Sequence, residues 1–146
     1  SSRPRVARSR IGLGPDAAAA CVDDSMPWAV GGHSLGGVAA SSYAGSHPEV
    51  DGLVLWASFP VADISDRTSL EASSITGSAD GLSTPEKVDD RKPLLPPGTE
   101  FVEIPGAIHS FFGDYGLQPG DGTPTISRED AQAQITAATV ALLDRL

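Results

Sequence analysis

The sequence predicts an α/β fold with a mostly parallel sheet and flanking helices, and three observations predict it. Segments typical of strands alternate with segments typical of helices along the 146 residues, which is the order found in parallel α/β proteins. The strand segments 27–31 and 52–57 are apolar throughout instead of alternating, as in strands covered on both faces. A glycine-rich turn joins the first of them to a helix of small residues. The apolar content of 40% is enough for the core of one domain.

The individual elements are predicted from apolar runs and from the residues that begin and end them. In chain order we expect strand 27–31, helix 35–47, strand 52–57, a polar stretch 58–69, strand 70–76, a short helix at 84–90, strand 100–104, a loop at 105–125 and a last helix at 127–145. Pro85 suits the first turn of the short helix, where its missing N–H is not needed. Ser127 can cap the last helix, in which Ala131 and Ile135 recur at helical spacing. The loop is long for a compact domain, and loops of that length are usually functional.

The turn from Gly32 to Gly36 carries the pattern G-x-S-x-G between the first strand and the first helix. This is the context of a nucleophile elbow, in which glycines allow a sharp turn and a strained serine exposes its hydroxyl. We therefore expect Ser34 to be a nucleophile. The Leu35 N–H lies at the N-terminus of the helix, where it can stabilise an oxyanion. The bare pattern is weak in a chain with 16 glycines, so a glycine-rich turn without catalysis is the alternative.

A serine nucleophile needs a base, and the chain offers three histidines. We expect His33, next to Ser34 on the turn, to point away from the hydroxyl and to serve local packing. We expect His47 to end the first helix, where a histidine favours the helix dipole and is normally solvated. His109 stands in the long glycine-punctuated loop after a strand, the kind of segment that carries function. His109 is the expected base, and packing on neighbouring aromatic rings is the alternative.

The base in turn needs a carboxylate that orients it. Asp80 stands just beyond the third predicted strand, from where it could hydrogen-bond a histidine in the loop after the next strand. Because Asp-Gly is also an ordinary turn dipeptide, a pure turn role is the alternative. The competing acids are Asp63, Asp66 and Asp114. The expected site residues then occur in the chain order Ser34, Asp80, His109.

That order is the one found in α/β-hydrolases, and the sequence resembles the small dienelactone-hydrolase-like branch of these enzymes. Three motifs carry the resemblance: GGHSLGG at 31–37, G-x-x-D-G-L at 77–82 and H-x-x-F-G-x-Y-G-L-Q at 109–118. It implies that Ser34 is the nucleophile, Asp80 the acid and His109 the base. The Leu35 N–H would be half of an oxyanion hole. The implied activity is a serine hydrolase that cleaves an ester or related acyl substrate through an acyl-enzyme. Ile108 departs from the asparagine that relatives often carry there.

A second departure lies at the start of the chain, because only 31 residues precede Gly32, too few for the first four strands of a complete α/β-hydrolase. We expect residues 26–146 to be the C-terminal portion of that fold. Residues 1–25 are basic and alanine-rich and would not match that fold. A truncated or mis-framed gene start would explain them, and a genuine basic tail is the alternative. The second oxyanion donor would then be missing. The alternative function is a weak or inactive hydrolase fragment that acts as an interaction module or self-associates through an exposed sheet edge.

Composition restricts the partners further. A net charge of −9 and a pI near 4.5 argue against nucleic acid, which needs a basic face. One cysteine and three scattered histidines offer neither a disulfide framework nor a zinc spacing. We therefore expect a small-molecule acyl substrate and no cofactor, metal or nucleic acid. The apolar run 17–21 is too short to span a membrane, and no signal-peptide pattern is visible, so a cytoplasmic location is the default expectation.

Overall fold

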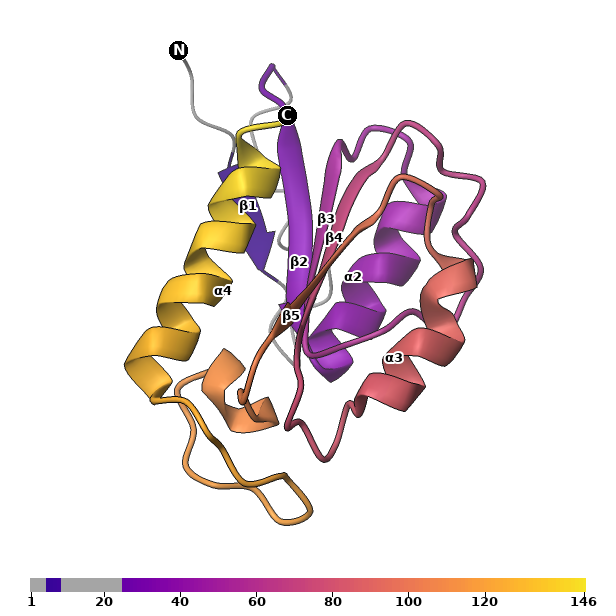
Figure 1. Ribbon diagram of the computed structural model, residues 1–146. Coiled ribbons are helices and arrows are strands. Elements are labelled where there is room, and N and C mark those ends of the chain that lie inside the picture. Colours follow the sequence, from indigo (N-terminus) through magenta and orange to yellow (C-terminus); the bar gives the residue numbers. More distant parts are fainter. Residues whose placement is uncertain (1–4, 9–24) are drawn as a thin grey trace.

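The computed structural model describes residues 5–8 and 25–146, which form one parallel sheet with helices on both faces (Figure 1). The sheet has the strand order β1-β2-β3-β4-β5, and every neighbouring pair is parallel. The strands are β1 Arg5–Arg8, β2 Trp28–His33, β3 Gly52–Trp56, β4 Glu71–Gly77 and β5 Glu100–Ile104. The register begins with the pairs Arg5–Trp28, Ala29–Gly52, Gly52–Glu71 and Ser73–Glu100.

Helices cover the two faces of the sheet, with α2 and α3 on one side and α4 on the other (Figure 1). The helices are α2 Leu35–Ser46, α3 Pro85–Arg91 and α4 Arg128–Leu143, with the short 3-10 helices η1 Lys92–Leu94 and η2 His109–Phe112. Because strand side chains alternate between faces, the core has two parts. Leu53 and Leu55 of β3 pack in one part with Ala40 of α2. Val54 packs in the other part with Ile135 of α4.

The predicted fold class is confirmed, and the helix and strand ends shift by only one or two residues. The capping predictions are also confirmed. The Ser127 hydroxyl oxygen accepts the Asp130 N–H at 3.1 Å, and Pro85 stands in the first turn of α3. The region expected as one loop at 105–125 contains η2. The apolar pattern predicted neither this short helix nor η1.

Strand β1 is a further difference from the predicted elements. Its four residues Arg-Val-Ala-Arg have no local strand signal, and the strand exists through its parallel pairing with β2. The other residues before position 25 (1–4 and 9–24) lie outside the described residues. The expected boundary between a non-matching segment 1–25 and a domain 26–146 therefore stays a prediction. Association through a sheet edge also stays a prediction.

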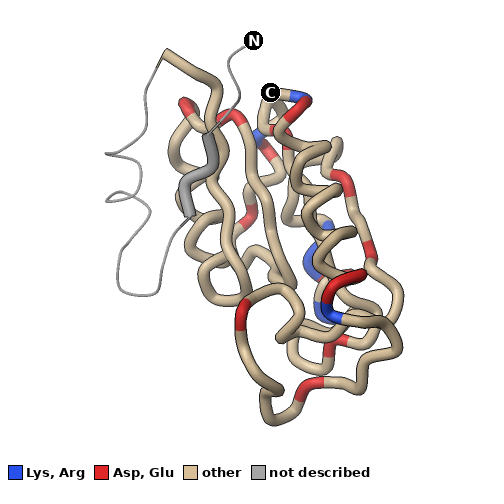
Figure 2. The backbone as a smooth tube through the Cα atoms, turned by 90° about the vertical axis from the view of Figure 1, so that its left-hand side faces the viewer, with Lys and Arg blue, Asp and Glu red and all other residues tan. Residues whose placement is uncertain are grey.

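Two further features of the described chain are the distribution of its charged residues and the hydropathy of its helices. Figure 2 shows that the positions of acidic residues are spread along the backbone of the described chain, whereas the positions of basic residues are fewer. None of the helices in the described part of the chain is long and apolar enough to cross a membrane.

Candidate active site

Ser34 occupies the turn between β2 and α2 in a strained conformation, with φ 53° and ψ −119°. A non-glycine residue rarely adopts a positive φ, so the surrounding structure must hold it there. The Ser34 N–H donates to the carbonyl oxygen of Trp56 at 3.0 Å. The Ser34 carbonyl accepts from the Gly37 N–H at 3.0 Å and from the Ser58 hydroxyl at 2.6 Å. These contacts fix the main chain on both sides of the Ser34 side chain, which is half-buried.

Glycine is required at the elbow because main-chain segments approach closely there. A Cβ at Gly32 would collide with the carbonyl group of Gly36, and a Cβ at Gly37 would collide with the Ser58 side chain. The first collision confirms the predicted need for glycine at position 32. The close approach lets α2 begin directly beneath Ser34, so that the helix N-terminus faces the serine.

Asp80 and His109 meet although 28 residues separate them in the sequence. The Asp80 Oδ2 and the His109 Nδ1 are 2.8 Å apart, and both side chains are almost completely buried. Because an ionised carboxylate can only accept a hydrogen bond, Nδ1 carries the proton in this contact. The other ring nitrogen, Nε2, is then the unprotonated one. The Asp80 Oδ1 also accepts the Leu82 and Ser83 N–H groups, each at 2.8 Å. The turn role and the contact with histidine, posed as alternatives from the sequence, therefore coexist in one carboxylate.

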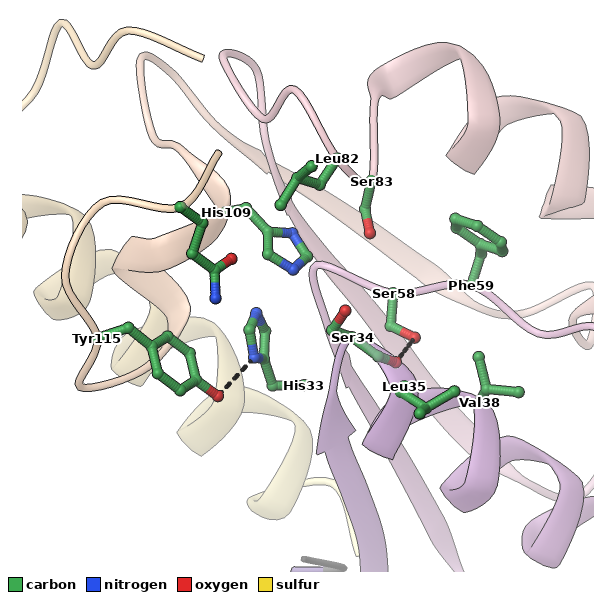
Figure 3. Close-up of a pocket in the computed structure, with 11 residues that line it drawn as sticks. His33, Ser34, Leu35, Val38, Ser58, Phe59, Leu82, Ser83, His109 and Tyr115 are labelled. Carbon is green, nitrogen blue, oxygen red and sulfur yellow. Dashed lines mark hydrogen bonds between the residues drawn. The ribbon is translucent and has the colours of Figure 1, made fainter. Parts of the chain in front are cut away.

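Ser34 and His109 line the same cavity, which has a volume of about 520 Å³. Figure 3 shows the two side chains facing this space from different elements, the turn before α2 and the start of η2. In the described structure they share the cavity without a direct hydrogen bond. Such contacts are often long in unliganded sites and tighten when substrate binds. The cavity lies at the carboxyl ends of the parallel strands, where open α/β sheets bind ligands.

The competing carboxylates lie away from this cavity. Asp63 accepts from the N–H and the hydroxyl of Ser65, two residues along the same loop. Asp114 is exposed, and neither it nor Asp66 lines the cavity. Among these acids of the described chain, only Asp80 contacts His109.

His33 lines the cavity of the candidate site, a position that the sequence analysis did not predict. Its ring lines the cavity with a centroid 4.6 Å from that of His109. Its Nδ1 is 3.0 Å from the Tyr115 hydroxyl oxygen (Figure 3). Burial, and then the neighbouring His109, lower the pKa of His33 from 6.5 to about 4. His33 is therefore neutral at neutral pH and adds no positive charge beside His109. The expected role in local packing is compatible with these ring contacts.

The lowered pKa of His33 predicts that acidification destabilises the fold. The unfolded chain takes up this proton near pH 6.5 but the folded chain only near pH 4, so between these values the unfolded state binds more protons and stability falls as the pH is lowered. We expect this group to remove about 1 to 2 kcal/mol of unfolding free energy between about pH 7 and about pH 4.5, allowing for the partial exposure of the ring. Urea titrations of the wild type and of His33→Gln measure the difference. Equal pH dependence in both proteins would contradict the prediction.

His47, the third histidine, ends α2 as expected and does not line the cavity. Its ring stacks on Tyr43 with centroids 3.7 Å apart, so it is packed on the helix surface more than predicted. Its Nδ1 lies 2.8 Å from the Tyr43 carbonyl oxygen. His47 therefore belongs to the end of the helix and not to the candidate site.

Several supporting residues were missed by the sequence analysis. The Ser83 hydroxyl donates to the carbonyl of Ala57 at 2.7 Å, and Ala57 is a second strained residue, with φ 48°. Arg128, at the start of α4, donates to the carbonyl oxygens of Gly113 at 2.8 Å and Tyr115 at 2.6 Å, which anchors the loop after His109. Contacts of this kind have no periodic pattern in the sequence.

No group of three or more His, Cys, Asp or Glu side chains in the described residues is placed to hold a metal ion.

A parallel sheet with helices on both faces and a strained serine in the turn after β2 defines an α/β protein with a strand–turn–helix elbow. Residues 9–133 match the model of the alpha/beta hydrolase family, and the chain belongs to that family. This result confirms the family resemblance carried by the three motifs, and it agrees with the fold class predicted from the alternating strand and helix segments. A search of the curated proteins found no relative.

Solved structures show the same fold at low sequence identity. A dienelactone hydrolase-like promiscuous phosphotriesterase from metagenomic libraries is 20% identical with a TM-score of 0.65, over 90% of this chain and 57% of that one. A candidate dienelactone hydrolase from Klebsiella pneumoniae is 22% identical with a TM-score of 0.60, over 84% and 55%. A candidate CIB-like hydrolase from Thermoplasma acidophilum is 17% identical with a TM-score of 0.59, over 82% and 52%. The chain thus spans a little over half the length of these structures.

Proposed function

We propose that this chain acts as a serine hydrolase on an ester or related acyl substrate, with Ser34 as nucleophile, His109 as base and Asp80 as the acid that orients the base. The observation that carries the proposal is the shared cavity of Ser34 and His109, with His109 held by Asp80 at 2.8 Å on its other side. Nucleophile, base and orienting carboxylate are the three parts that serine hydrolysis needs. Membership of the alpha/beta hydrolase family supports the same class of reaction.

The reaction follows from the positions of these groups. His109 Nε2 takes the hydroxyl proton as Ser34 Oγ attacks the substrate carbonyl, and the Asp80 carboxylate stabilises the imidazolium that forms. The protonated His109 then gives its proton to the leaving group as the acyl-enzyme forms. A water molecule, deprotonated by His109, attacks the acyl-enzyme and releases the acid. His109 passes the proton of the water to Ser34 Oγ as the acyl–oxygen bond breaks, so serine and histidine return to their starting protonation states.

The oxyanion formed in each step needs donors that are already in place. Leu35 is the first residue of α2 and lines the cavity. The first N–H groups of a helix have no partner within the helix and lie at the positive end of its dipole. The Leu35 N–H is therefore suited to stabilise the oxyanion.

The cavity walls favour an uncharged acyl substrate. Leu35, Val38, Phe59 and Leu82 form apolar walls around Ser34 (Figure 3). Within the described residues, no Asp, Glu, Lys or Arg side chain lines the cavity. A charged substrate group would lose hydration there without gaining an oppositely charged Asp, Glu, Lys or Arg partner. The net charge of −9 disfavours anions further.

This proposal predicts a preference for a neutral ester over a matched anionic one. We expect kcat/KM to be at least about tenfold higher for p-nitrophenyl valerate than for the p-nitrophenyl monoester of glutarate, since an unpaired carboxylate in the cavity costs more than about 1.4 kcal/mol. The two acyl chains differ only at their ends, a methyl group against a carboxylate. Release of p-nitrophenol, corrected for spontaneous hydrolysis, gives both constants.

Two results would count against the proposal. Equal or faster turnover of the monoester would contradict the substrate preference. A folded chain that turns over neither ester would contradict the proposed activity and favour an inactive hydrolase fragment.

A further inference from the structure

One carboxylate in the loop after η2 accepts four main-chain N–H groups. The Asp121 Oδ1 accepts from Gly81 at 3.2 Å, from His109 at 3.1 Å and from Gly122 at 2.8 Å. The Asp121 Oδ2 accepts from Ser110 at 3.0 Å. Both oxygens are thus used, and three of the four donors lie in other segments of the chain.

These donors belong to the two segments that carry the proposed acid and the proposed base. Gly81 directly follows Asp80 in the turn after β4, while His109 and Ser110 begin η2. Asp121 is therefore bonded to the main chain on both sides of the 2.8 Å contact between Asp80 and His109. A displacement of either segment would break at least one of these bonds.

Close packing joins the same segments. A Cβ at Gly81 would collide with the Gly120 carbonyl oxygen, and a Cβ at Gly122 would collide with the Ala79 carbonyl oxygen. Gly120 has φ +85°, a left-handed conformation that glycine adopts at no steric cost. The Gly-Asp-Gly segment at 120–122 thus lies directly on the turn that holds Asp80.

The electrostatic environment keeps the Asp121 side chain charged. Partial burial by itself raises the pKa of this carboxyl, but the main-chain N–H groups outweigh burial and hold its pKa below the ordinary value. Hydrogen bonds to a charged acceptor are roughly twice as strong as neutral ones. The segment is thus held by stronger bonds than an ordinary loop contact.

We propose that Asp121 is a positioning residue of the proposed active site, whose carboxylate ties the Asp80 turn to the start of η2 so that the Asp80–His109 hydrogen bond keeps its geometry. This inference rests on the proposed function for its effect on catalysis. Asp121 does not line the cavity, so it acts through the segments that carry Asp80 and His109 and not on the substrate.

Asp121→Asn tests the proposal with the smallest change in shape. Its amide oxygen can keep the bonds of Oδ1, but its NH₂ group then faces the Ser110 N–H, so two donors oppose each other. We expect kcat to fall by about 10- to 100-fold while KM stays within about threefold, because the misplaced histidine affects the chemical step more than substrate binding. We also expect the downfield NMR signal of the His109 Nδ1 proton to broaden or disappear in a variant whose other signals remain native.

Two control variants and one substitute variant complete this experiment. Asp114→Asn, an exposed aspartate in the same loop, is the matched control and should leave kcat and the downfield signal unchanged. Asp80→Asn removes the signal and so assigns it. If Asp121→Asn does not fold, Asp121→Glu takes its place with the same expected loss, since the charge remains but the added methylene shifts the oxygens.

A folded variant at position 121 with kcat within about twofold of the wild type and an intact downfield signal would overturn the proposal and leave Asp121 a loop-stabilising residue only. The NMR signal needs no substrate, so it tests the positioning role even if the proposed hydrolysis fails. Failure of the proposed function itself would show instead as a folded wild type that turns over neither ester, or as wild-type turnover by Ser34→Ala.

Discussion

Ser34→Ala is expected to lower kcat for ester hydrolysis by about 10⁴-fold or more, as the loss of the nucleophile does in known serine hydrolases. The substitution removes the oxygen that would form the acyl-enzyme. None of the other hydroxyl groups that line the cavity stands on the strained turn, where Ser34 has φ 53°. A fluorophosphonate probe should label the wild-type chain at Ser34 and leave the variant unlabelled. Mass spectrometry of the labelled peptide identifies the modified residue.

Ser42→Ala is the matched control for this substitution. Ser42 lies on the exposed face of α2, eight residues after Ser34 in the sequence, and its replacement should change neither turnover nor labelling. Labelling that survives in Ser34→Ala would remove Ser34 from the mechanism. Labelling lost in Ser42→Ala as well would show that the assay reports the integrity of the helix.

Asp80→Asn is expected to lower kcat by about 10⁴-fold, the loss seen when the acid of a serine triad is replaced by its amide. The amide oxygen can still accept the Leu82 and Ser83 N–H groups that bond Asp80 Oδ1 at 2.8 Å, so the turn should survive. The amide NH₂ then faces His109 Nδ1 and forces its proton onto the opposite nitrogen. His109 could no longer take the proton of Ser34. Initial rates with p-nitrophenyl esters measure the loss, and circular dichroism checks the fold.

Asp114→Asn separates the two acids that remained open from the sequence. Asp114 follows His109 by only five residues but is exposed and does not line the cavity. We expect its replacement to change kcat by less than about threefold, as is usual for a surface substitution away from a site. A large loss in Asp114→Asn together with a small loss in Asp80→Asn would assign the acid to the histidine loop.

Local signals in the sequence account for most of the elements and for the elbow. Apolar runs, the cap at Ser127 and the proline in the first turn of α3 act within a few residues, so they predict a helix or strand wherever the rest of the chain lies. The G-x-S-x-G turn is local in the same sense, because the collision of a Cβ at Gly32 with Gly36 involves residues four apart. The three ordered motifs also indicated the family, which the match over residues 9–133 confirms.

The sequence by itself thus determined the parallel α/β architecture, the strained serine turn and the short set of polar residues from which a site could be built. Only the tertiary structure decided that Asp80, and not Asp114, contacts His109, that His33 lies beside His109 with its pKa near 4, and that Asp121 bonds both loops. Asp121 stands in a Gly-Asp-Gly segment that looks like an ordinary turn, and its Gly81 donor is 40 residues away. Hydrogen bonds between distant loops depend on how the strands place their ends in space, and no periodicity of the chain encodes that placement.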